Sequence, residues 1–328
     1  MKTFTCPLSE LLITQLKKSQ HRIQFLLLFL AFGTFGVLQG QTTYTSTANT
    51  TWSSMAWSPA GTPGPTDNVV INHNVTADVP VAINNFTLNA SRTLLTSSSN
   101  FVVNGTSSIS GTFRDNAAGG NITFIGASTI AIGGRIDNNA SVAADVEFRA
   151  GVTNSGTIAL QNASLAKFTT ANQSIAGAGA TTIANILVVG NITLSNYSTN
   201  GSGIVCTDAL DGTTTNSTFA NFNGTILTYR GANEPMATAG FLNVSASGNT
   251  VNYNGSVQTV KSTTYFNLSY TAAGAKTTGD ATILGTMTRT NGTLTFNGTQ
   301  IFSGSTAGAL NTNTTITFNE LQINKAGS

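Results

Sequence analysis

The sequence predicts an all-β fold, a right-handed parallel β-helix (β-solenoid) with about 22 residues per coil and an N-terminal cap. One observation is a repeat: a glycine-led motif and an Asn-Ala pair within it both return at a nearly constant interval. Another is that each copy leads into a short apolar strand ending in Phe. A fixed period of this size indicates stacked units that bury their apolar sides only against neighbours. The copies begin at Gly111, Gly134 and Gly156, contain Asn116, Asn139 and Asn162, and end at Phe124, Phe148 and Phe168.

The composition favours repetitive β structure over disorder. Thr, Asn, Gly, Ser and Ala dominate, and only 8% of the residues are charged, yet 40% are hydrophobic. Disordered chains combine low hydrophobicity with high net charge, which this chain lacks. Apolar triplets such as Phe86–Leu88 and Phe101–Val103 recur instead. Residues 76–328 are therefore predicted to form the solenoid, and the whole of 41–328 corresponds to about 13 coils.

Residues 1–40 are predicted to be a secretory signal peptide that is cleaved near Gly40. Lys17, Lys18 and Arg22 precede an apolar run that starts at Phe25 and fades by Leu38. The run is shorter than the roughly 18–20 residues that span a bilayer, and small residues follow it. The alternative is a retained membrane anchor. A cleaved leader implies a secreted or cell-surface protein with no other membrane contact.

The excess of basic over acidic residues in the whole chain comes from this leader. The totals are 14 Lys plus Arg and 12 Asp plus Glu; residues 1–40 hold four of the former and one of the latter, leaving 10 and 11. No basic face for nucleic acid is visible in the remainder. Cys206 is the only cysteine after residue 40. An intramolecular disulfide is therefore excluded in the mature part, and stacking has to hold the coils together.

Residues 41–75 are predicted to form a linker and a cap. Trp52 and Trp57, the only tryptophans, precede a Pro- and Gly-rich turn over residues 59–65. The first coil of a solenoid exposes its core, and bulky aromatic residues beside a turn suit a lid over it. The alternative is a tryptophan pair that stacks on carbohydrate.

The pattern W-x4-W-S-P-x-G-x-P-G-P-x-D-N-V-x-I, which starts at Trp52, carries a family resemblance. It resembles the opening of secreted, adhesin-like β-helix proteins of Bacteroidota-type bacteria, which are usually type IX secretion cargo. It is similar, more loosely, to the start of G8-type domains. The resemblance covers only this segment of the cap. It implies a secreted or cell-surface solenoid and no chemistry.

A second, longer repeat is expected in the C-terminal part. The Asn-Gly pairs at Asn254 and Asn297 stand about 43 residues apart within similar apolar segments, which predicts a unit of two coils. Residues 197–216 are more polar and are expected to form a loop or an irregular coil. The chain stops at Ser328 within this second repeat, so we expect a truncated solenoid and a C-terminal continuation of the same protein.

Six Asn-Gly pairs followed by Ser or Thr punctuate the strands. Asn and Gly tolerate left-handed backbone angles, so these pairs are expected at sharp corners, where stacked Asn side chains can bond one another along the coils. Asn-x-Ser/Thr triplets also match glycosylation acceptors, but corner geometry explains them better in so Asn- and Thr-rich a chain.

Candidate catalytic and metal-binding residues are few. His73 is the only histidine after the leader, so a His/Cys metal cluster is excluded there. Asp115 and Asp137 are expected at equivalent corners one coil apart, within the reach of a glycosidase pair, with Arg114 and Arg135 stacked beside them. Since solvated charge ladders look the same, catalysis is disfavoured. Two further carboxylates, Asp208 and Asp211, are weak support for a calcium site.

Ice binding is a third hypothesis, because rows of Thr-x-Thr on a flat solenoid face can order water. The triplets start at Thr286, Thr293, Thr312 and Thr315, but they are not spaced by one coil length. Strand propensity explains them better.

We therefore expect a non-catalytic, secreted or cell-surface solenoid that serves as a stalk or adhesin-like interaction segment of a larger exported protein. No catalytic, cofactor-binding or metal residue is assigned; the candidate partners are surface glycans or proteins, without nucleic acid. The main alternative is a carbohydrate-active β-helix enzyme of the lyase or hydrolase type. The placement of Asp115, Asp137, Asp145 and Glu147 relative to Arg114, Arg135 and Arg149 separates the two hypotheses.

Overall fold

The computed structural model describes residues 40–117, 119–139, 141–304, 309–313 and 315–325. Contacts divide the chain into two units, Met1–Gln41 and Thr42–Ser328, and all 34 strands of the described residues belong to the second. The expected leader lies, except for Gly40, outside the described residues. Within them, no helix has the length and apolar character that crossing a membrane requires.

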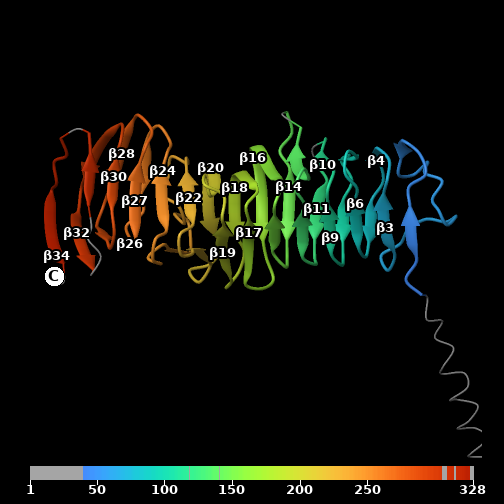
Figure 1. Cartoon of the computed structure of the whole chain (residues 1–328), viewed down its shortest axis with the longest axis horizontal. Helices are drawn as coiled ribbons and strands as arrows, with labels where there is room; N and C mark the ends of the chain where they lie inside the picture. Colours follow the sequence, from blue (N-terminus) through green and yellow to red (C-terminus); the bar gives the residue numbers. More distant parts are fainter. Residues whose placement is uncertain (1–39, 118, 140, 305–308, 314, 326–328) are drawn as a thin grey trace, which may run out of the picture. The chain divides into compact units, whose positions relative to one another are not determined.

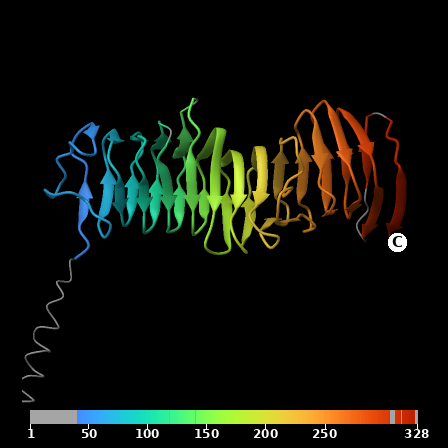
Figure 2. The same ribbon diagram turned by 180° about the vertical axis from the view of Figure 1, so that it is seen from behind.

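The described chain winds through parallel strands that repeat three faces in a fixed order (Figures 1 and 2). Most strands pair with the strand one coil earlier and the strand one coil later. The coils differ in length: on the first face one coil leads from Thr43 to Asn68, and the next only from Val69 to Phe86. The predicted β-solenoid is confirmed, with an average coil of about 21 residues, close to the predicted length. The right hand of the coil stays a prediction.

The first face runs from one end of the solenoid unit to the other. Its strands are β1 (Thr43–Thr45), β3 (Asn68–Ile71), β6 (Phe86–Leu88), β9 (Ser107–Ile109), β12 (Ser128–Ile130), β15 (Val152–Asn154), β17 (Gln173–Gly177), β19 (Thr193–Ser198), β21 (Thr218–Asn221), β23 (Phe241–Asn243), β26 (Thr264–Tyr265), β29 (Ala281–Ile283), β32 (Thr299–Gly304) and β34 (Glu320–Lys325). Its ladder is interrupted once, between β23 and β26, where a single bridge joins Val244 to Tyr265.

The second face follows the first around each coil. Its strands are β2 (Thr50–Thr51), β4 (Val75–Ala77), β7 (Thr93–Thr96), β10 (Thr112–Asp115), β13 (Arg135–Asn138), the first halves of β16 (Thr157–Phe168), β18 (Ala180–Val188) and β20 (Ile204–Gly212), then β22 (Ile226–Tyr229), β24 (Thr250–Tyr253), β27 (Asn267–Tyr270), β30 (Met287–Arg289) and β33 (Leu310–Thr312). Strand β2, like β1 and β3 on the first face, already lies within residues 41–75, the segment expected to be linker and cap.

The third face closes each coil. It consists of β5 (Val81–Ile83), β8 (Phe101–Val103), β11 (Asn121–Phe124), β14 (Asp145–Phe148), the second halves of β16, β18 and β20, and then β25 (Gln258–Val260), β28 (Ala275–Thr278) and β31 (Thr293–Phe296). In the coil after β20, residues 230–240 contain no named strand.

Three long strands turn the corner between the second and third faces without a break. The register of β16 with β18 shifts between Leu160 and Leu165, which marks a bulge at that corner. Asn162 and Ala163 adopt left-handed φ angles of 54° and 59° there. A bulge bends a strand while it preserves pairing on both sides, which lets one strand serve two faces. Residues 197–216, expected to be irregular, contain another of these strands, β20, so that expectation was wrong.

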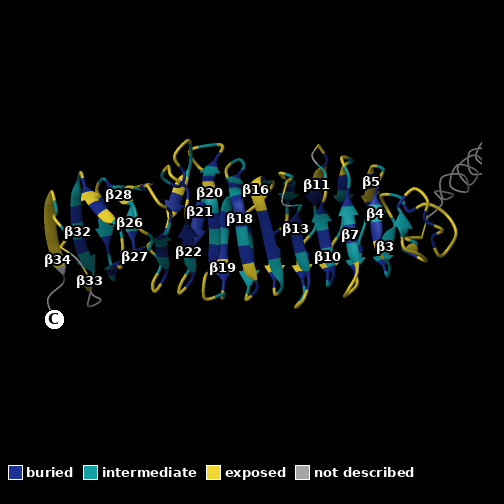
Figure 3. Cartoon of the chain, turned by 90° about the horizontal axis from the view of Figure 1, so that it is seen from above, coloured by how far each residue is buried: buried dark blue, intermediate teal, exposed yellow. Residues whose placement is uncertain are grey.

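Buried and more exposed side chains alternate along most strands, and the buried ones build the core. Strands such as β6 and β8 have buried residues at both ends and a more exposed residue between them, because successive side chains point to opposite sides of a sheet. Burial therefore follows the strands, and exposure concentrates at the corners (Figure 3). The buried apolar residues form one continuous cluster from Trp52 to Phe302.

A ladder of phenylalanines confirms the first sequence repeat. Phe124, Phe148 and Phe168 are register partners on the third face. Their rings stack with centroids 5.5 Å apart at both steps, and each side chain is at most 1% exposed. The glycine-led motifs also coincide, since Thr112 pairs with Arg135 and Arg135 with Thr157. The period of the sequence repeat thus corresponds to one coil.

The two tryptophans pack inside the first coils. Trp52 and Trp57 are 4% and 5% exposed, with ring centroids 4.7 Å apart, and Trp52 meets Phe101 edge-on. The segment folds back through paired backbone bonds between Thr45 and Ser58. Because both indoles are buried, the alternative that they stack on carbohydrate is wrong.

The second sequence repeat does not correspond to a structural repeat. Asn254 follows β24 on the second face, whereas Asn297 follows β31 on the third. Two coils after Val251 the chain reaches Met287, whereas the sequence repeat would place Leu294 there. The prediction of a two-coil unit is therefore wrong. All three faces require the same apolar-x-apolar strand and polar corner, so similar segments recur out of phase.

Corner asparagines bond one another as expected, but the Asn-Gly pairs are not all left-handed. Asn139 donates from Nδ2 to Asn116 Oδ1 across 3.1 Å, one coil apart. Of the six Asn-Gly pairs, only Gly224 and Gly292 have φ in the left-handed region, 71° and 81°. Gly255 is needed for another reason, since a Cβ there would approach Arg230 O to 2.4 Å.

Candidate functional site

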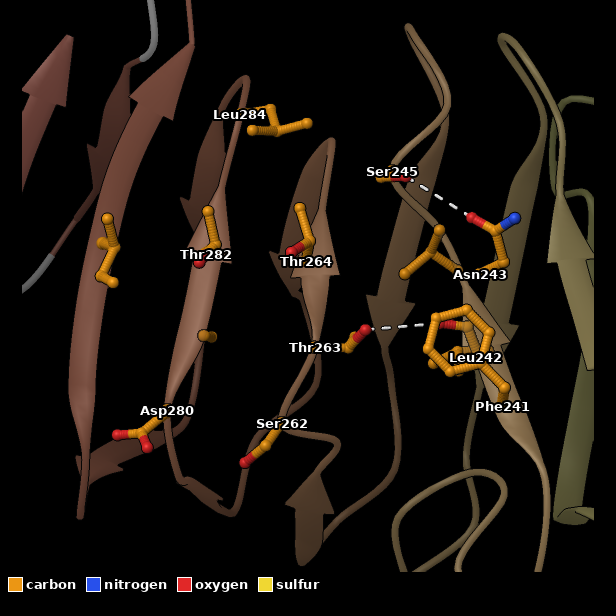
Figure 4. A pocket seen from close by; sticks show the side chains of 13 residues that line it. Phe241, Leu242, Asn243, Ser245, Ser262, Thr263, Thr264, Asp280, Thr282 and Leu284 are labelled. Carbon is orange, nitrogen blue, oxygen red and sulfur yellow. Dashed lines mark hydrogen bonds between the residues drawn. The ribbon is translucent and has the colours of Figure 1, made fainter. Parts of the chain in front are cut away.

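A hollow lies on the first face, where its ladder is interrupted. It is a groove of about 680 Å³ that spans β23, β26, β29 and β32 (Figure 4). Phe266 N donates to Val244 O at 2.9 Å at one edge, but near the other edge Leu242 O accepts the Thr263 hydroxyl, at 3.4 Å, in place of a backbone amide. Replacement of a ladder bond by a side-chain contact lets β23 and β26 part and opens the groove.

A change in coil length accompanies this opening. One coil leads from Thr218 to its register partner Phe241, whereas beyond the opening a distinctly shorter coil leads from Thr264 to Thr282. A comparable change in coil length near the start of the first face, from Thr43–Asn68 to Val69–Phe86, leaves the ladder intact. The groove thus coincides with a change from longer to shorter coils, and what distinguishes it is the reduction of the ladder between β23 and β26 to a single bridge.

The lining falls into three parallel rows along the first face, which Figure 4 shows as two edges and a centre. The central row is polar: Asn243, Thr264 and Thr282 point outward from successive strands. Alternation places the buried Leu242 and Val244 on the opposite side. The edge rows consist of Phe241, Ser262 and Asp280 on one side and Ser245 and Leu284 on the other.

Several hydrogen-bonding groups that line the groove are not engaged by other described residues. Ser245 Oγ donates to Asn243 Oδ1 at 3.4 Å, which leaves the Asn243 amide group available to donate. Within the described residues, the hydroxyls of Thr264 and Thr282 have no hydrogen-bond partner. Phe241 is 55% exposed although it is a large aromatic residue. Exposed aromatic surface beside unpaired hydroxyl and amide groups is the chemistry of a binding surface.

The groove is nearly free of charge. Asp280 is its only ionisable lining residue, and its Oδ1 accepts a bond from Thr299 N at 2.7 Å. Among the lining residues there is thus no second carboxylate to act with it. General acid–base hydrolysis of a glycoside requires two carboxyl groups, and the lining of this groove supplies one of them.

The charged residues that the sequence singled out lie elsewhere. Asp137, on the second face, accepts a bidentate pair of bonds from Arg114 at 2.7 and 2.8 Å and another from Arg135 at 2.5 Å. Burial works to raise the pKa of Asp137, but the two arginines outweigh it and lower the pKa. The expected charge ladder is present here, and it neutralises Asp137.

Asp115 does not occupy the position equivalent to Asp137, so this part of the sequence interpretation was wrong by one residue. Register pairs Arg114 with Asp137 and Asp115 with Asn138. Because neighbours in a strand face opposite sides, Asp115 points into the core, where it is 1% exposed. Thr96 donates to its Oδ1 at 2.6 Å, while Oδ2 has no partner among the described residues. Burial raises the pKa of Asp115.

The third face carries a separate set of ion pairs. Lys167 Nζ contacts Asp145 Oδ2 at 2.8 Å, and Arg149 binds both oxygens of Glu147 at 2.8 and 3.0 Å. The bonds from Arg149 lower the pKa of Glu147, although burial opposes them. Asp115, Asp137, Asp145 and Glu147 are thus divided among the core, the second face and the third face, so the four do not line one groove. Asp145 and Glu147 share a small hollow of about 110 Å³ with Lys167.

The other candidates have structural roles. His73 Nδ1 contacts the Ser46 hydroxyl at 3.1 Å beside the first coil. Asp211 Oδ1 accepts bonds from the backbone amides of Gly212, Thr238 and Ala239, which ties down the strandless part of the next coil. No group of three or more metal-ligating side chains forms among the described residues. Cys206 is fully buried, and burial raises the pKa of its thiol to about 12.

The threonine triplets do not form a flat array. Thr288 belongs to β30 on the second face, whereas Thr293 and Thr295 belong to β31 on the third. Thr314 lies outside the described residues. These side chains therefore point in different directions, and they provide no surface that could match an ice lattice.

Sequence reasoning missed the groove because its residues carry no motif. One signal was available in Phe241-Leu-Asn-Val-Ser245, whose alternation puts an aromatic residue, an amide and a hydroxyl on the side opposite two apolar residues. Comparison with family models, with curated proteins and with solved structures gives no match for this chain. The site is therefore argued from its geometry alone.

Proposed function

We propose that this chain is a non-catalytic, exported β-solenoid that acts as an adhesin-like interaction segment and binds surface glycans through the groove on its first face. The observation that carries the proposal is the lining of that groove. It combines an exposed aromatic ring at Phe241 with unpaired hydroxyls at Thr264 and Thr282, and its one carboxylate is Asp280. Such a surface can hold a sugar but has no acid–base pair to cleave it.

The distribution of the remaining charges supports a binding role. A carbohydrate-active enzyme of the hydrolase type needs two carboxyl groups that face one substrate. Asp137, on the second face, is paired with two arginines. Asp145 and Glu147 share a small hollow on the third face, but each is engaged by its own cation, Lys167 and Arg149. The solenoid then serves both as a stalk and as the scaffold that presents the groove.

Export is supported by the residues that precede the solenoid. A basic segment followed by a short apolar run ends in small residues near Gly40, and the pattern from Trp52 onward resembles that of secreted β-helix proteins. We expect the mature protein to begin near Gln41. Amino-terminal sequencing of the protein recovered from its native cell surface or medium tests this, and an uncleaved Met1 would contradict it.

A polysaccharide panel tests binding against catalysis. The purified chain is mixed with neutral and acidic polysaccharides, and retention of the protein is measured together with release of reducing ends or unsaturated products. We expect retention without product. Product release would establish the carbohydrate-active alternative, and the absence of retention on every polysaccharide would leave only a stalk. Asn243→Ala is the variant for the groove, and Ile132→Ala, at an 88% exposed corner position, is its control.

A further inference from the structure

An exposed aromatic pair lies on the first face two coils before the groove. Tyr197, on β19, is 43% exposed, and its ring centroid stands 4.1 Å from that of Phe222. Register pairs Asn196 with Asn221, so the residues that follow them occupy neighbouring positions in adjacent coils. Both side chains alternate with the buried asparagines and therefore point outward.

This pair is in line with one edge of the groove. Strands β21 and β23 pair Phe219 with Leu242. Three residues further along both strands, the same register places Phe222 beside Ser245. Ser245 and Leu284 form that edge in Figure 4. The first face thus carries a row that starts at Tyr197 and is apolar at Phe222 and Leu284 but polar at Ser245. Beside it lies the central row of Asn243, Thr264 and Thr282, which continues into the apolar Ile301.

The repeat of these rows matches an extended polysaccharide. Neighbouring strands are about 4.8 Å apart, which is close to the length of one pyranose unit in an extended glycan. A pyranose ring has an apolar C–H face that packs on aromatic and aliphatic side chains, and hydroxyls at its rim that bond amide and hydroxyl groups. Positions of both kinds recur along the first face, although not in every coil, so several sugars of an extended chain can make both kinds of contact.

The charge of the lining residues and the hydrogen bonds of the β23 backbone limit the class of ligand further. None of the lining residues is Lys or Arg, and Asp280 would repel uronate or sulfate groups. A peptide that binds by strand addition needs free backbone groups at a sheet edge. Here Leu242 O and Val244 O are already engaged by Thr263 and Phe266. A neutral glycan fits these features better than a protein strand.

We infer that the Tyr197–Phe222 pair and the groove are two parts of one site for a neutral, extended polysaccharide that runs along the first face. The inference rests on the proposed function, in which the groove binds without cleaving. It adds the class of ligand, its direction along the coils, and a second contact region that the groove itself does not contain. From β19 to β32 the site covers about six strand positions, and so about six sugar units.

The test is titration calorimetry of the purified chain with neutral β-1,4-linked oligosaccharides from disaccharide to octasaccharide. We expect affinity to rise with length and to level off near the hexasaccharide. Tyr197→Ala should weaken binding of the hexasaccharide by about threefold to tenfold and leave the disaccharide unaffected, since one stacking ring is lost. Tyr197→Phe keeps the ring and should bind like the original chain. Asn243→Ala should weaken binding at every length.

The outcomes separate this inference from the proposed function. Binding that depends on Asn243 but neither on ligand length nor on Tyr197 would overturn the inference and leave the proposed function standing. Tighter binding of a polyuronate than of the neutral chains would overturn the assignment of ligand class in the same way. No binding to any glycan, binding only to a protein, or release of product would overturn both. Matching urea midpoints of the variants establish that each one is folded.

Discussion

Two aspartates in adjacent coils are expected to respond in opposite ways to the same substitution. Asp115 faces the core with Oδ2 unpartnered among the described residues, whereas Asp137 lies on the outer side and accepts three bonds from two arginines. Asp→Asn removes the charge and nearly keeps the shape. Asp115→Asn should therefore stabilise the fold or leave it unchanged, and Asp137→Asn should destabilise it.

The magnitudes follow from what each carboxylate loses or gains. An unsatisfied buried polar group costs about 1–3 kcal/mol, and more when charged. Asparagine removes the charge but leaves an amide group in place of the unpartnered oxygen, so Asp115→Asn should raise the free energy of unfolding at neutral pH by about 0–2 kcal/mol. Removing one partner of a buried ion pair costs about 3–5 kcal/mol. Arg114 and Arg135 are 40% and 41% exposed, so solvent screening reduces the expected loss for Asp137→Asn to about 1–2 kcal/mol.

The pH dependence has opposite signs at the two sites. Burial raises the pKa of Asp115 above 3.8, so its penalty is absent below pH 3.8 and grows as pH rises through the folded-state pKa. The pKa of Asp137 lies below 3.8, so its contribution is present above that value and is lost as pH falls through the folded-state pKa. Both differences from the original chain should therefore shrink toward zero in acid.

Urea unfolding of the original chain and both variants, at neutral pH and at a series of acidic pH values, measures these differences. Hydrogen exchange of the β10 and β13 amides localises them to the two coils. A loss of stability for Asp115→Asn equal to that for Asp137→Asn would refute the one-residue register and the inward orientation of Asp115. A pH-independent difference for either variant would refute the assigned charge.

Three further predictions concern the core. Phe148→Ala removes the middle ring of a stacked ladder and should lower the free energy of unfolding by about 3–5 kcal/mol. Phe148→Leu should lower it less, and the exposed control Thr129→Ala should change it by no more than about 0.5 kcal/mol. Urea unfolding midpoints measure all three. Lys276, 1% exposed, donates to Gly255 O and Ser256 O, and burial lowers its pKa below 10.5. The unfolding free energy of the original chain relative to Lys276→Met should therefore rise as pH increases toward 10.5, and a flat difference would contradict this. Cys206, with its pKa raised to about 12, should react with thiol reagents only at the rate of local unfolding, and rapid labelling of the native chain would disprove its burial.

The repeat unit was predictable because it has a single physical cause. Each coil must place inward side chains over those of the previous coil, so Phe124, Phe148 and Phe168 recur at nearly the coil length. The burial of Trp52 and Trp57 was also foreseeable, since a terminal coil needs apolar cover. The longer C-terminal repeat failed because the pattern that satisfies one face satisfies all three, and sequence similarity does not state which face a segment occupies.

The charged residues show that a register error of one residue is enough to place a side chain on the wrong side of the sheet. Asp115 and Asp137 both come shortly after an arginine within a glycine-led motif, which suggests that they are equivalent. Pairing Gly111 with Gly134 shifts the match by one, to Arg114 with Asp137. One residue of shift moves a side chain from solvent to core. The glycosidase-like pair therefore becomes an ion pair on one side of the sheet and an isolated carboxylate on the other.

The groove could not be predicted from the sequence for a related reason. Other hollows lie on regular coils, but this groove lies where the ladder of the first face fails. The failure here coincides with a shortening of the coil between the Thr218–Phe241 step and the Thr264–Thr282 step, and it leaves one bridge between Val244 and Tyr265 in place of a ladder. Periodicity searches discard such a segment as noise. In this chain the break in the ladder, and not a cluster of charged residues, marks the position of the groove.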